Sequence, residues 1–360
     1  MTDTFYRFDC GFSDSLLDNI PFVKNGEKSK FLILPYGTYS YVANTANDAY
    51  SFVDENKTLV FLIPTYNYCS QNLMTFYENN LLNYDIDYEL LNEILLSFEL
   101  DREEFKFEEQ EIFKLHYDLV KGKFSKIKIL PLFFYNLQSG IIVDILNKYS
   151  EKCTFVLLSN LSSGLNYRDA QKFDVYTASC IEQSVEKDYS VESFTAFKVL
   201  PEILKFFRQR RFYFIRLALL NSADYNKNLA STKGFGAWFL YEGTPRRYLK
   251  TYYSDLILDF VKFNLQKNLR VACTEKCFNL PAVFNQEFKV FVSLEKNDFV
   301  RGVNGSFKEL VPFYMALTKR TFGCAFSDER FAPLKPEELD KINLTVTLMG
   351  DEVLRSAVIE

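Results

Sequence analysis

The chain contains one histidine, His116, and seven cysteines, so few residues could act as soft metal ligands or nucleophiles. A single histidine excludes any site that needs two or more imidazoles from one chain, such as a three-histidine zinc site. A serine or cysteine hydrolase mechanism would have to run through His116 alone. Cys273 and Cys277 are spaced like half of a zinc site, but no second cysteine or histidine pair accompanies them. We therefore predict two partly buried thiols and no metal site there.

Two charged segments could bind ligands, but each has a simpler interpretation. The acidic residues between Asp101 and Glu111 are interleaved with Phe and Ile, which is typical of a solvated helix or strand face. The basic segment from Lys205 to Arg216 is interleaved with aromatic residues, as in proteins that bind single-stranded nucleic acid. We favour a cation-rich helix C-terminus followed by a buried strand, because the formal net charge is −5. The Gly-x-Gly of 233–237 is interpreted as a loop without phosphate binding.

Composition places the chain among globular proteins. Its 360 residues suggest about two domains, and the hydrophobic fraction of 48% with 25% charged residues argues against wholesale disorder. The odd number of widely spaced cysteines favours a reducing compartment. The segment Met1–Cys10 lacks the apolar core of a signal peptide, and no apolar run approaches the ~20 residues of a membrane span. We expect a cytoplasmic protein that binds neither membrane nor nucleic acid.

Short apolar runs alternate with helical patterns over the first two thirds of the chain, which indicates an α/β layered domain. The runs predict buried strands at 31–34, 59–63, 127–132, 154–158 and 212–220. Helical spacing predicts helices that include 40–53 and 193–208.

The segment Glu242–Arg247 combines a glycine with a proline and is the best candidate for a domain boundary. A helix is predicted after it at 253–265, followed by strands at 289–294 and 343–349. We therefore predict domains at 1–243 and 244–360, the second being smaller and α+β.

Four blocks of the first domain resemble, in order and spacing, the Memo-like family. Pro35–Tyr41 resembles the P-H-A-G-Y-x-Y opening of that family, and Phe61–Asn67 resembles its L-G-P-S-H-H. Ser159–Tyr167 is similar to S-D-L-S-H-Y-L-P-Y, and Thr195–Leu200 falls where the family has C-G-x-x-P-I. The resemblance implies a class III extradiol dioxygenase-like fold, an α/β mixed-sheet layered domain with a metal-binding cleft at its strand ends.

The residues that match the family's metal ligands differ in chemistry from imidazole and thiolate. They are Tyr36, Tyr66, Ser163 and Thr195, and the acidic position is Asn160. Divalent iron, copper and zinc prefer imidazole, thiolate or carboxylate. Two tyrosines could serve ferric iron, an alternative that we favour less because no carboxylate or histidine accompanies them. We predict no metal, no cofactor and a cleft of hydroxyls and amides that includes Asn67.

The second domain resembles the AMMECR family more closely. Val290–Leu294 followed by Val300–Phe307 is similar to F-V-T-L and L-R-G-C-I-G-T-F, and Ala325–Leu339 is close to A-A-x-x-D-x-R-F-P-P-L-T-P-E-E-L. Val303 stands at the signature cysteine, so thiol chemistry there is lost. Family members continue for a further stretch beyond the position of Glu360, which predicts a shortened domain.

The signature loop is a second candidate ligand-binding site. Its residues are Arg301, Gly302, Asn304 and Gly305. Glycines permit close backbone approach, and arginine can bind a carboxylate or phosphate through two N–H groups. We favour a structural role, in which Gly305 relieves crowding against a helix and Arg301 pairs with Asp328 or Glu329, because the reactive cysteine is absent.

The two families occur together with a radical-SAM protein in a three-part system, so the resemblance implies such a partner. We expect a non-catalytic binding or assembly protein with a degenerate cleft. The alternative is an enzyme with altered, metal-independent chemistry, in which Tyr36, Tyr66 and Thr195 position a substrate. Its general base would be missing, because Glu109 is only a candidate and His116 is predicted to be a half-buried strand residue. Ligand, substrate and oligomeric state are left open.

Overall fold

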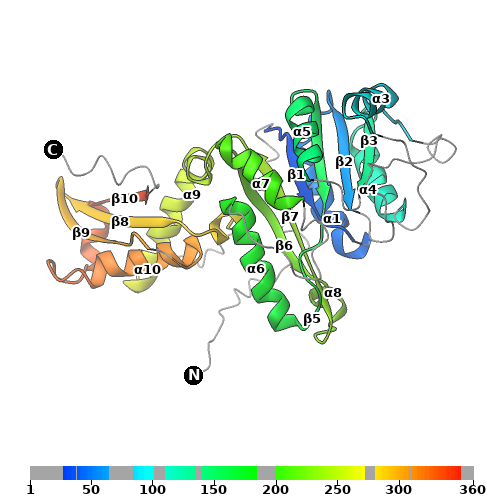
Figure 1. The fold of residues 1–360 in the computed structure, drawn as a ribbon. Helices are drawn as coiled ribbons and strands as arrows, with labels where there is room; N and C mark the ends of the chain where they lie inside the picture. The colour runs from blue at the N-terminus through cyan, green and yellow to red at the C-terminus, as the bar shows by residue number, and fades with distance from the viewer. Residues whose placement is uncertain are drawn as a thin grey trace. The chain divides into compact units, whose positions relative to one another are not determined.

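The computed structural model describes residues 27–37, 39–64, 84–100, 110–134, 139–184, 199–271, 280–308 and 310–349. The chain divides into two compact units at Thr244 and Pro245. We call them the N-terminal unit, described from 27 to 244, and the C-terminal unit, described from 245 to 349. Figure 1 shows the elements of both units.

The N-terminal unit is built on a mixed seven-stranded sheet with the order β3-β2-β4-β1-β7-β5, in which β6 also pairs with β7. The strands are β1 (Phe31–Leu34), β2 (Thr58–Pro64), β3 (Ile129–Phe134), β4 (Cys153–Leu158), β5 (Ser163–Leu165), β6 (Tyr213–Asn221) and β7 (Thr232–Tyr241). The first four are parallel, and β5, β6 and β7 pair antiparallel. Nearly every residue of the parallel strands is buried, as continuous apolar runs predict for strands covered on both faces.

Helices cover both faces of this sheet (Figure 1). They are α1 (Tyr39–Ala49), α3 (Tyr88–Ser97), α4 (Gln110–Lys123), α5 (Ser139–Tyr149), α6 (Tyr167–Gln183), α7 (Leu200–Gln209) and the short α8 (Ser222–Asn226). The crossover from β1 to β2 and the crossover from β3 to β4 run in opposite directions along the sheet. Right-handed crossovers therefore place α1 and α5 on opposite faces, and α1 packs with α4 whereas α5 packs with α7.

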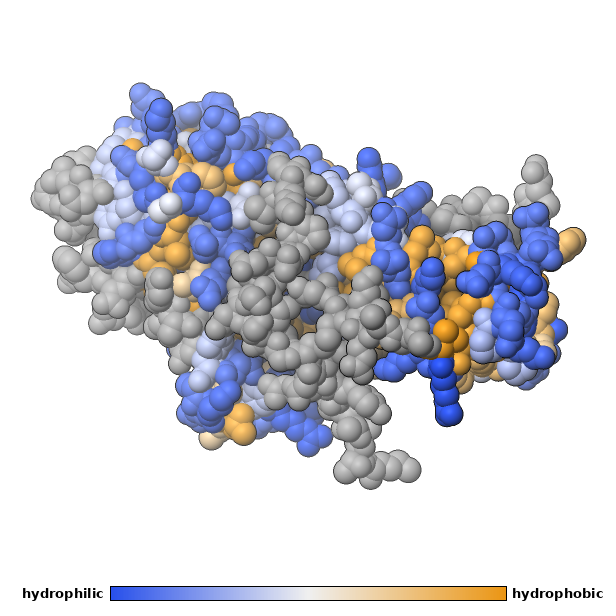
Figure 2. Space-filling model, turned by 180° about the vertical axis from the view of Figure 1, so that it is seen from behind, coloured by the Kyte–Doolittle hydropathy of each residue, from blue (hydrophilic) through white to orange (hydrophobic). Residues whose placement is uncertain are grey.

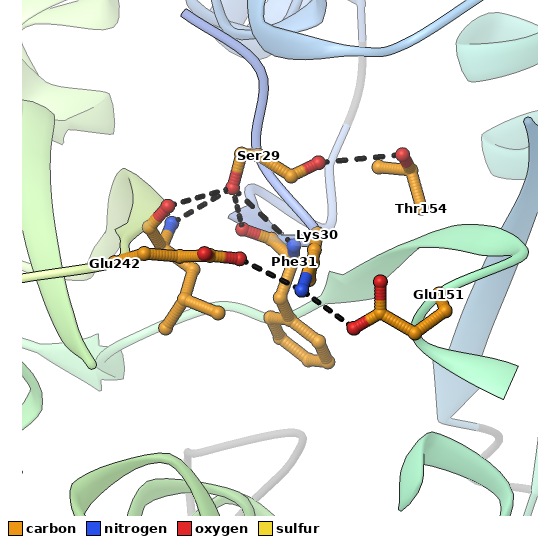
Figure 3. A network of polar contacts seen from close by, with 7 residues as sticks. Ser29, Lys30, Phe31, Glu151, Thr154 and Glu242 are labelled. Carbon is orange, nitrogen blue, oxygen red and sulfur yellow. Dashed lines mark hydrogen bonds and ion pairs between the residues drawn. The ribbon is translucent and has the colours of Figure 1, made fainter. Parts of the chain in front are cut away.

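The amino ends of β1 and β4 are held together by a polar network (Figure 3). Ser29 Oγ donates to the Leu240 carbonyl and accepts from the Leu240 N–H, at 3.0 and 3.1 Å. Thr154 Oγ1 donates to the Ser29 carbonyl at 3.3 Å. Lys30 forms ion pairs with Glu151 and with Glu242. The side chains at the amino ends of β1 and β4 are therefore engaged in contacts within the protein.

The C-terminal unit has a three-stranded antiparallel sheet with the order β10-β8-β9. Its elements are α9 (Pro245–Asn268), the 3-10 turn η5 (Ala282–Asn285), β8 (Lys289–Lys296), β9 (Phe299–Gly305), α10 (Phe313–Phe326), η6 (Pro336–Lys341) and β10 (Ile342–Met349). Val290, Val292 and Leu294 alternate as fully buried residues along β8, and α10 packs on β8 and β9. The unit also exposes several large apolar side chains, including Phe299 and Leu310, and Figure 2 shows apolar surface on it bordered by hydrophilic residues.

The α/β unit followed by a smaller α+β unit confirms the predicted fold class at this level, and the predicted strands all form. Three local predictions were wrong or inexact. The segment 233–237 is part of β7 and not a loop. Of the helix predicted at 193–208, the structure describes only the part from Val199 onward, and there α7 starts at Leu200. The helix predicted at 253–265 starts earlier, at Pro245, a residue suited to the first turn because it needs no N–H partner.

Among the described helices, none combines the length and apolar composition that a membrane span requires.

Candidate functional site

Two of the predicted cleft residues lie at the carboxyl ends of neighbouring parallel strands. Tyr36 follows β1 and Asn160 follows β4, and both are buried. The Ser159 N–H donates to the Leu34 carbonyl at 2.9 Å, and the Tyr36 N–H donates to the Ser159 carbonyl at 3.3 Å. The β1–β4 ladder thus continues past the strands and holds the two segments side by side. Ser163 lies further along the chain, half-buried in β5, where it pairs with Lys233 of β7.

The order of the strands also favours ligand binding at the carboxyl ends of the parallel strands. After β2 the next described strand is β3, on one side of β2, whereas after β4 the chain continues to β5 on the other side. In α/β sheets, ligands commonly bind at the carboxyl ends of neighbouring strands whose connections diverge in this way, and β2 and β4 are such a pair. Asn160 follows β4 at this point. Tyr66, Asn67 and Thr195 lie outside the described residues, as do Glu109, Cys273 and Cys277.

The donor set at this edge does not fit a divalent transition metal. Tyr36 and Asn160 offer a phenol and an amide, and Ser163 in β5 would add only a hydroxyl, so none of these groups supplies the charged or imidazole donor that such a metal prefers. Within the ranges that the structure describes, no three His, Cys, Asp or Glu side chains are grouped as a metal ion would need. The chemistry of the described residues suits hydrogen bonding to a polar ligand.

His116 was predicted to be a half-buried strand residue, and this was wrong. It lies in α4 and is completely buried. Tyr50 Oη lies 2.6 Å from Nδ1 and the Pro35 carbonyl lies 3.2 Å from Nε2, so Tyr50 donates to Nδ1 and Nε2–H donates to Pro35. Burial lowers the pKa of His116 to about 4. Because it is neutral and both nitrogens are engaged, His116 fixes the residue before Tyr36 and is not a free base.

Asp174 of α6, which also matches an acidic position of the third Memo-like block, is a buried carboxylate next to Ser162. Its oxygens accept hydrogen bonds from Ser162 N–H at 2.9 Å and from Ser162 Oγ at 3.0 Å. It is 3% exposed, and burial is the main reason that its pKa rises to about 7. A Cβ on Gly234 would lie 2.0 Å from Asp174 Oδ2, so a larger residue there would force the Asp174 carboxylate to move. Asp174 shares the buried helix face of Ala170 and Ile181, and a carboxylate on such a face is the signal that could have revealed it.

We expect Asp174→Asn to stabilise the N-terminal unit above neutral pH, by about 2 kcal/mol. The folded pKa of Asp174 lies above its unfolded value of 3.8, so the folded state binds the proton more tightly. The wild-type unit should therefore gain stability as the pH falls from above 7 toward 4, and lose it as the pH rises through about 7. Asparagine can accept from the Ser162 N–H and donate to its hydroxyl without a charge.

Urea unfolding between pH 5 and 8, followed by fluorescence of the chain's one tryptophan, tests this. That residue is Trp238 in β7, so its signal reports on the N-terminal unit. The exposed Asp144 of α5 provides the matched control, Asp144→Asn, which should leave the pH dependence unchanged. If the free energy of unfolding of Asp174→Asn varied with pH as in the wild type, the raised pKa of Asp174 would be contradicted.

The second candidate site, on β9, is largely occupied by contacts within the C-terminal unit. Arg301 pairs with Glu338 through Nε and Nη2 at 3.2 and 3.0 Å, and Nη2 also donates to the Ala332 carbonyl at 2.9 Å. The predicted partners Asp328 and Glu329 were therefore wrong. Arg301 is the main reason that the pKa of Glu338 falls to about 2, and Lys296 at 2.8 Å adds to the effect.

The glycines and the asparagine of this loop face neighbouring elements. A Cβ on Gly302 would lie 2.0 Å from the Cys324 carbonyl oxygen of α10, whereas a Cβ on Gly305 would meet the Phe291 ring of β8 at 2.1 Å. Gly302, and not Gly305 as predicted, thus permits the approach of the helix. Asn304 Oδ1 accepts from Arg320 of α10 at 3.2 Å. These contacts fit the structural role that the sequence favoured.

Val303, at the position of the family's cysteine, is tied to the loop after α10. Its N–H donates to Asp328 Oδ2 at 2.8 Å, and Asp328 also accepts three hydrogen bonds from Arg330, two from the guanidinium and one from the backbone N–H. These contacts hold the pKa of Asp328 well below its usual range. The thiol in this neighbourhood is that of Cys324, which is buried and whose pKa burial raises to about 12. It is therefore no substitute for a reactive cysteine.

Comparisons with known proteins identify the C-terminal part of the chain. Residues 260–355 match the AMMECR1 family model. A protein of Methanothermobacter thermautotrophicus is 41% identical over 83 residues, which span 23% of this chain and 41% of that relative. A crystal structure of an uncharacterized protein from Pyrococcus horikoshii is 23% identical, with a TM-score of 0.24, over 26% of this chain and 49% of the other. The sequence match and the named motifs agree, and residues 260–355 form an AMMECR1 domain.

Proposed function

We propose that the N-terminal unit is a degenerate Memo-like domain with the class III extradiol dioxygenase-like fold, and that its cleft binds a polar ligand without metal. In this proposal the chain is a non-catalytic binding or assembly component of an AmmeMemoRadiSam-type system, and a radical-SAM protein is its partner. The AMMECR1 domain at 260–355 supports the proposal, because the two families belong to the same system.

The observation that carries the proposal is the placement of Tyr36 and Asn160. Both follow adjacent parallel strands, next to the point where the connections of the sheet diverge. This is where an α/β sheet binds ligands, and the side chains there are neutral hydrogen-bonding groups. Such groups can orient a polar molecule but cannot replace imidazole or thiolate as ligands of iron, copper or zinc.

The alternative, an enzyme with metal-independent chemistry, needs a general base at this edge. His116 is neutral and engaged at both nitrogens. Asp174 has a pKa near neutrality, but both of its oxygens accept hydrogen bonds from Ser162, and it is buried. Catalysis by Asp174 would require the segment around Ser162 to move, so we favour binding.

Elemental analysis and native mass spectrometry of the protein purified from its own host test the proposal. We expect no stoichiometric transition metal, and a bound small molecule or a radical-SAM partner at defined stoichiometry. Near-stoichiometric iron, copper or zinc that is lost in the Tyr36→Phe/Tyr66→Phe double variant would refute a metal-free cleft. Tyr213→Phe, on β6, is the matched control and should change neither metal nor ligand content.

A further inference from the structure

The two edges of the C-terminal sheet differ in how they are protected. On β9, the Val303 N–H is capped by Asp328, and the register with β8 is interrupted between Leu294 and Glu295. Both a bulge and a capping carboxylate discourage another strand from pairing with an edge. Arg301 adds a charge to the same strand. β9 thus carries the features by which natural sheets avoid association.

Strand β10, at the opposite edge, lacks these features. It pairs with β8 through eight consecutive residues, from Ile342 opposite Lys296 to Met349 opposite Lys289, without a register shift. Its sequence INLTVTLM contains neither charge nor proline. In an antiparallel pair alternate residues direct their N–H and C=O groups away from the partner, and among the described residues no strand accepts these groups from β10.

The side chains of β10 are also incompletely covered. Leu344, Val346 and Leu348 lie opposite Leu294, Val292 and Val290, which are fully buried, and so face the same core. They themselves are only half-buried, whereas Asn343, Thr345 and Thr347 on the other face are exposed. A further strand beside β10 would extend the sheet and cover the half-buried row.

The pattern of β10 is complementary to itself. Two copies that run antiparallel, with Val346 opposite the partner's Val346, place Leu344 opposite the partner's Leu348. The same register places Thr345 opposite the partner's Thr347. Apolar residues then meet on the core face and threonines meet on the solvent face, which are favourable cross-strand pairs. Because β10 has no charged residue, this pairing neither buries a charge nor places like charges opposite each other. The two copies are related by a two-fold axis, so the assembly is limited to a dimer.

We propose that β10 is a dimerisation edge, through which two copies of this chain join their C-terminal sheets into one six-stranded antiparallel sheet. The interaction uses the outward N–H and C=O groups of β10 and the apolar row from Leu344 to Leu348. It is independent of the proposed function of the N-terminal unit, because it involves no residue of that unit.

Sedimentation velocity of the full chain over a range of concentrations tests the dimer, with two charge variants of the exposed threonines. Thr345→Lys/Thr347→Lys brings lysines face to face in the proposed register, and we expect the dimer dissociation constant to rise about tenfold or more. Thr345→Lys/Thr347→Glu places each lysine opposite a glutamate and should retain the dimer. Because two added lysines bring the acidic chain closer to neutrality, weaker association could not arise from overall charge.

Both variants change exposed side chains, and unchanged circular dichroism would show that β10 still forms. A wild-type chain that remains monomeric, or a dimer equally strong in both variants, would overturn the proposal. Slow hydrogen exchange of β10 amides at high but not at low protein concentration would support it, and exchange that is independent of concentration would contradict it.

Discussion

Replacing Arg216 by alanine is expected to destabilise the N-terminal unit by about 3–5 kcal/mol. Arg216 lies in β6 and Glu182 in α6, with side chains that are 7% and 3% exposed. The Arg216 guanidinium binds the Glu182 carboxylate through Nε and Nη2, and the Nη2–Oε2 distance is 2.9 Å. Trp238 Nε1 donates to Glu182 Oε1 at 3.1 Å. Removal of the guanidinium would leave a buried carboxylate without the cation that compensates its charge.

The charge explanation can be separated from the loss of side-chain volume. The double variant Arg216→Met/Glu182→Gln removes both charges, keeps most of the volume and retains an acceptor for Trp238, so it should recover most of the lost stability. Arg211→Ala, at an exposed position after α7, should be nearly neutral. Urea unfolding followed by the Trp238 signal measures all three. A double variant as unstable as Arg216→Ala would mean that packing, and not the unpaired charge, dominates.

Gly302→Ala is expected to destabilise the C-terminal unit by about 3 kcal/mol. The new methyl group would lie 2.0 Å from the Cys324 carbonyl oxygen, and this contact is to helix backbone, which cannot rotate away. Strand β9 and helix α10 would have to separate, at the expense of the buried contacts between them. The φ angle of Gly302 is not in the left-handed region, so the expected effect arises from the contact alone.

Hydrogen exchange of the β8 and β9 amides is the appropriate measurement, because the tryptophan lies in the other unit. We expect faster exchange in these strands and an unchanged Trp238 unfolding curve. Gly122→Ala in α4 is the opposite control: its Cβ meets nothing within 4 Å, so the change should stabilise its helix by about 0.5–1 kcal/mol. If the β8 and β9 amides of Gly302→Ala exchanged as slowly as in the wild type, α10 and β9 would have to approach each other less closely than the 2.0 Å contact implies.

Local sequence patterns determined most of the secondary structure. The apolar runs at 31–34 and 154–158 became parallel strands almost residue for residue, because a strand buried on both faces needs an uninterrupted apolar sequence. The alternation in 343–349 predicted β10 for the equivalent reason, since successive side chains of a strand point to opposite faces. The signature around 301–305 and 325–339 identified the AMMECR1 domain, which the family match confirms.

Other features depended on which segments meet in the folded chain. His116 was predicted to lie in a strand, yet it lies in α4, where Tyr50 and Pro35 engage its two nitrogens. Glu338 lies 37 residues from Arg301 and was not considered as its partner, because closer acids were available in the sequence. Pairs of this kind are set by the approach of elements that are distant in sequence, and local spacing carries no record of them.

The same distinction holds for the candidate sites. The sequence by itself determined the residue types at Tyr36, Asn160 and Val303, and therefore that imidazole and thiolate are absent from those positions. Only the tertiary structure decided that Tyr36 and Asn160 follow adjacent strands, that Asp174 is buried against Ser162 and Gly234, and that no strand within the described ranges pairs with the outer side of β10. The physical reason is that side-chain chemistry belongs to each residue, whereas burial, pKa and exposed backbone groups arise from the packing of elements against one another.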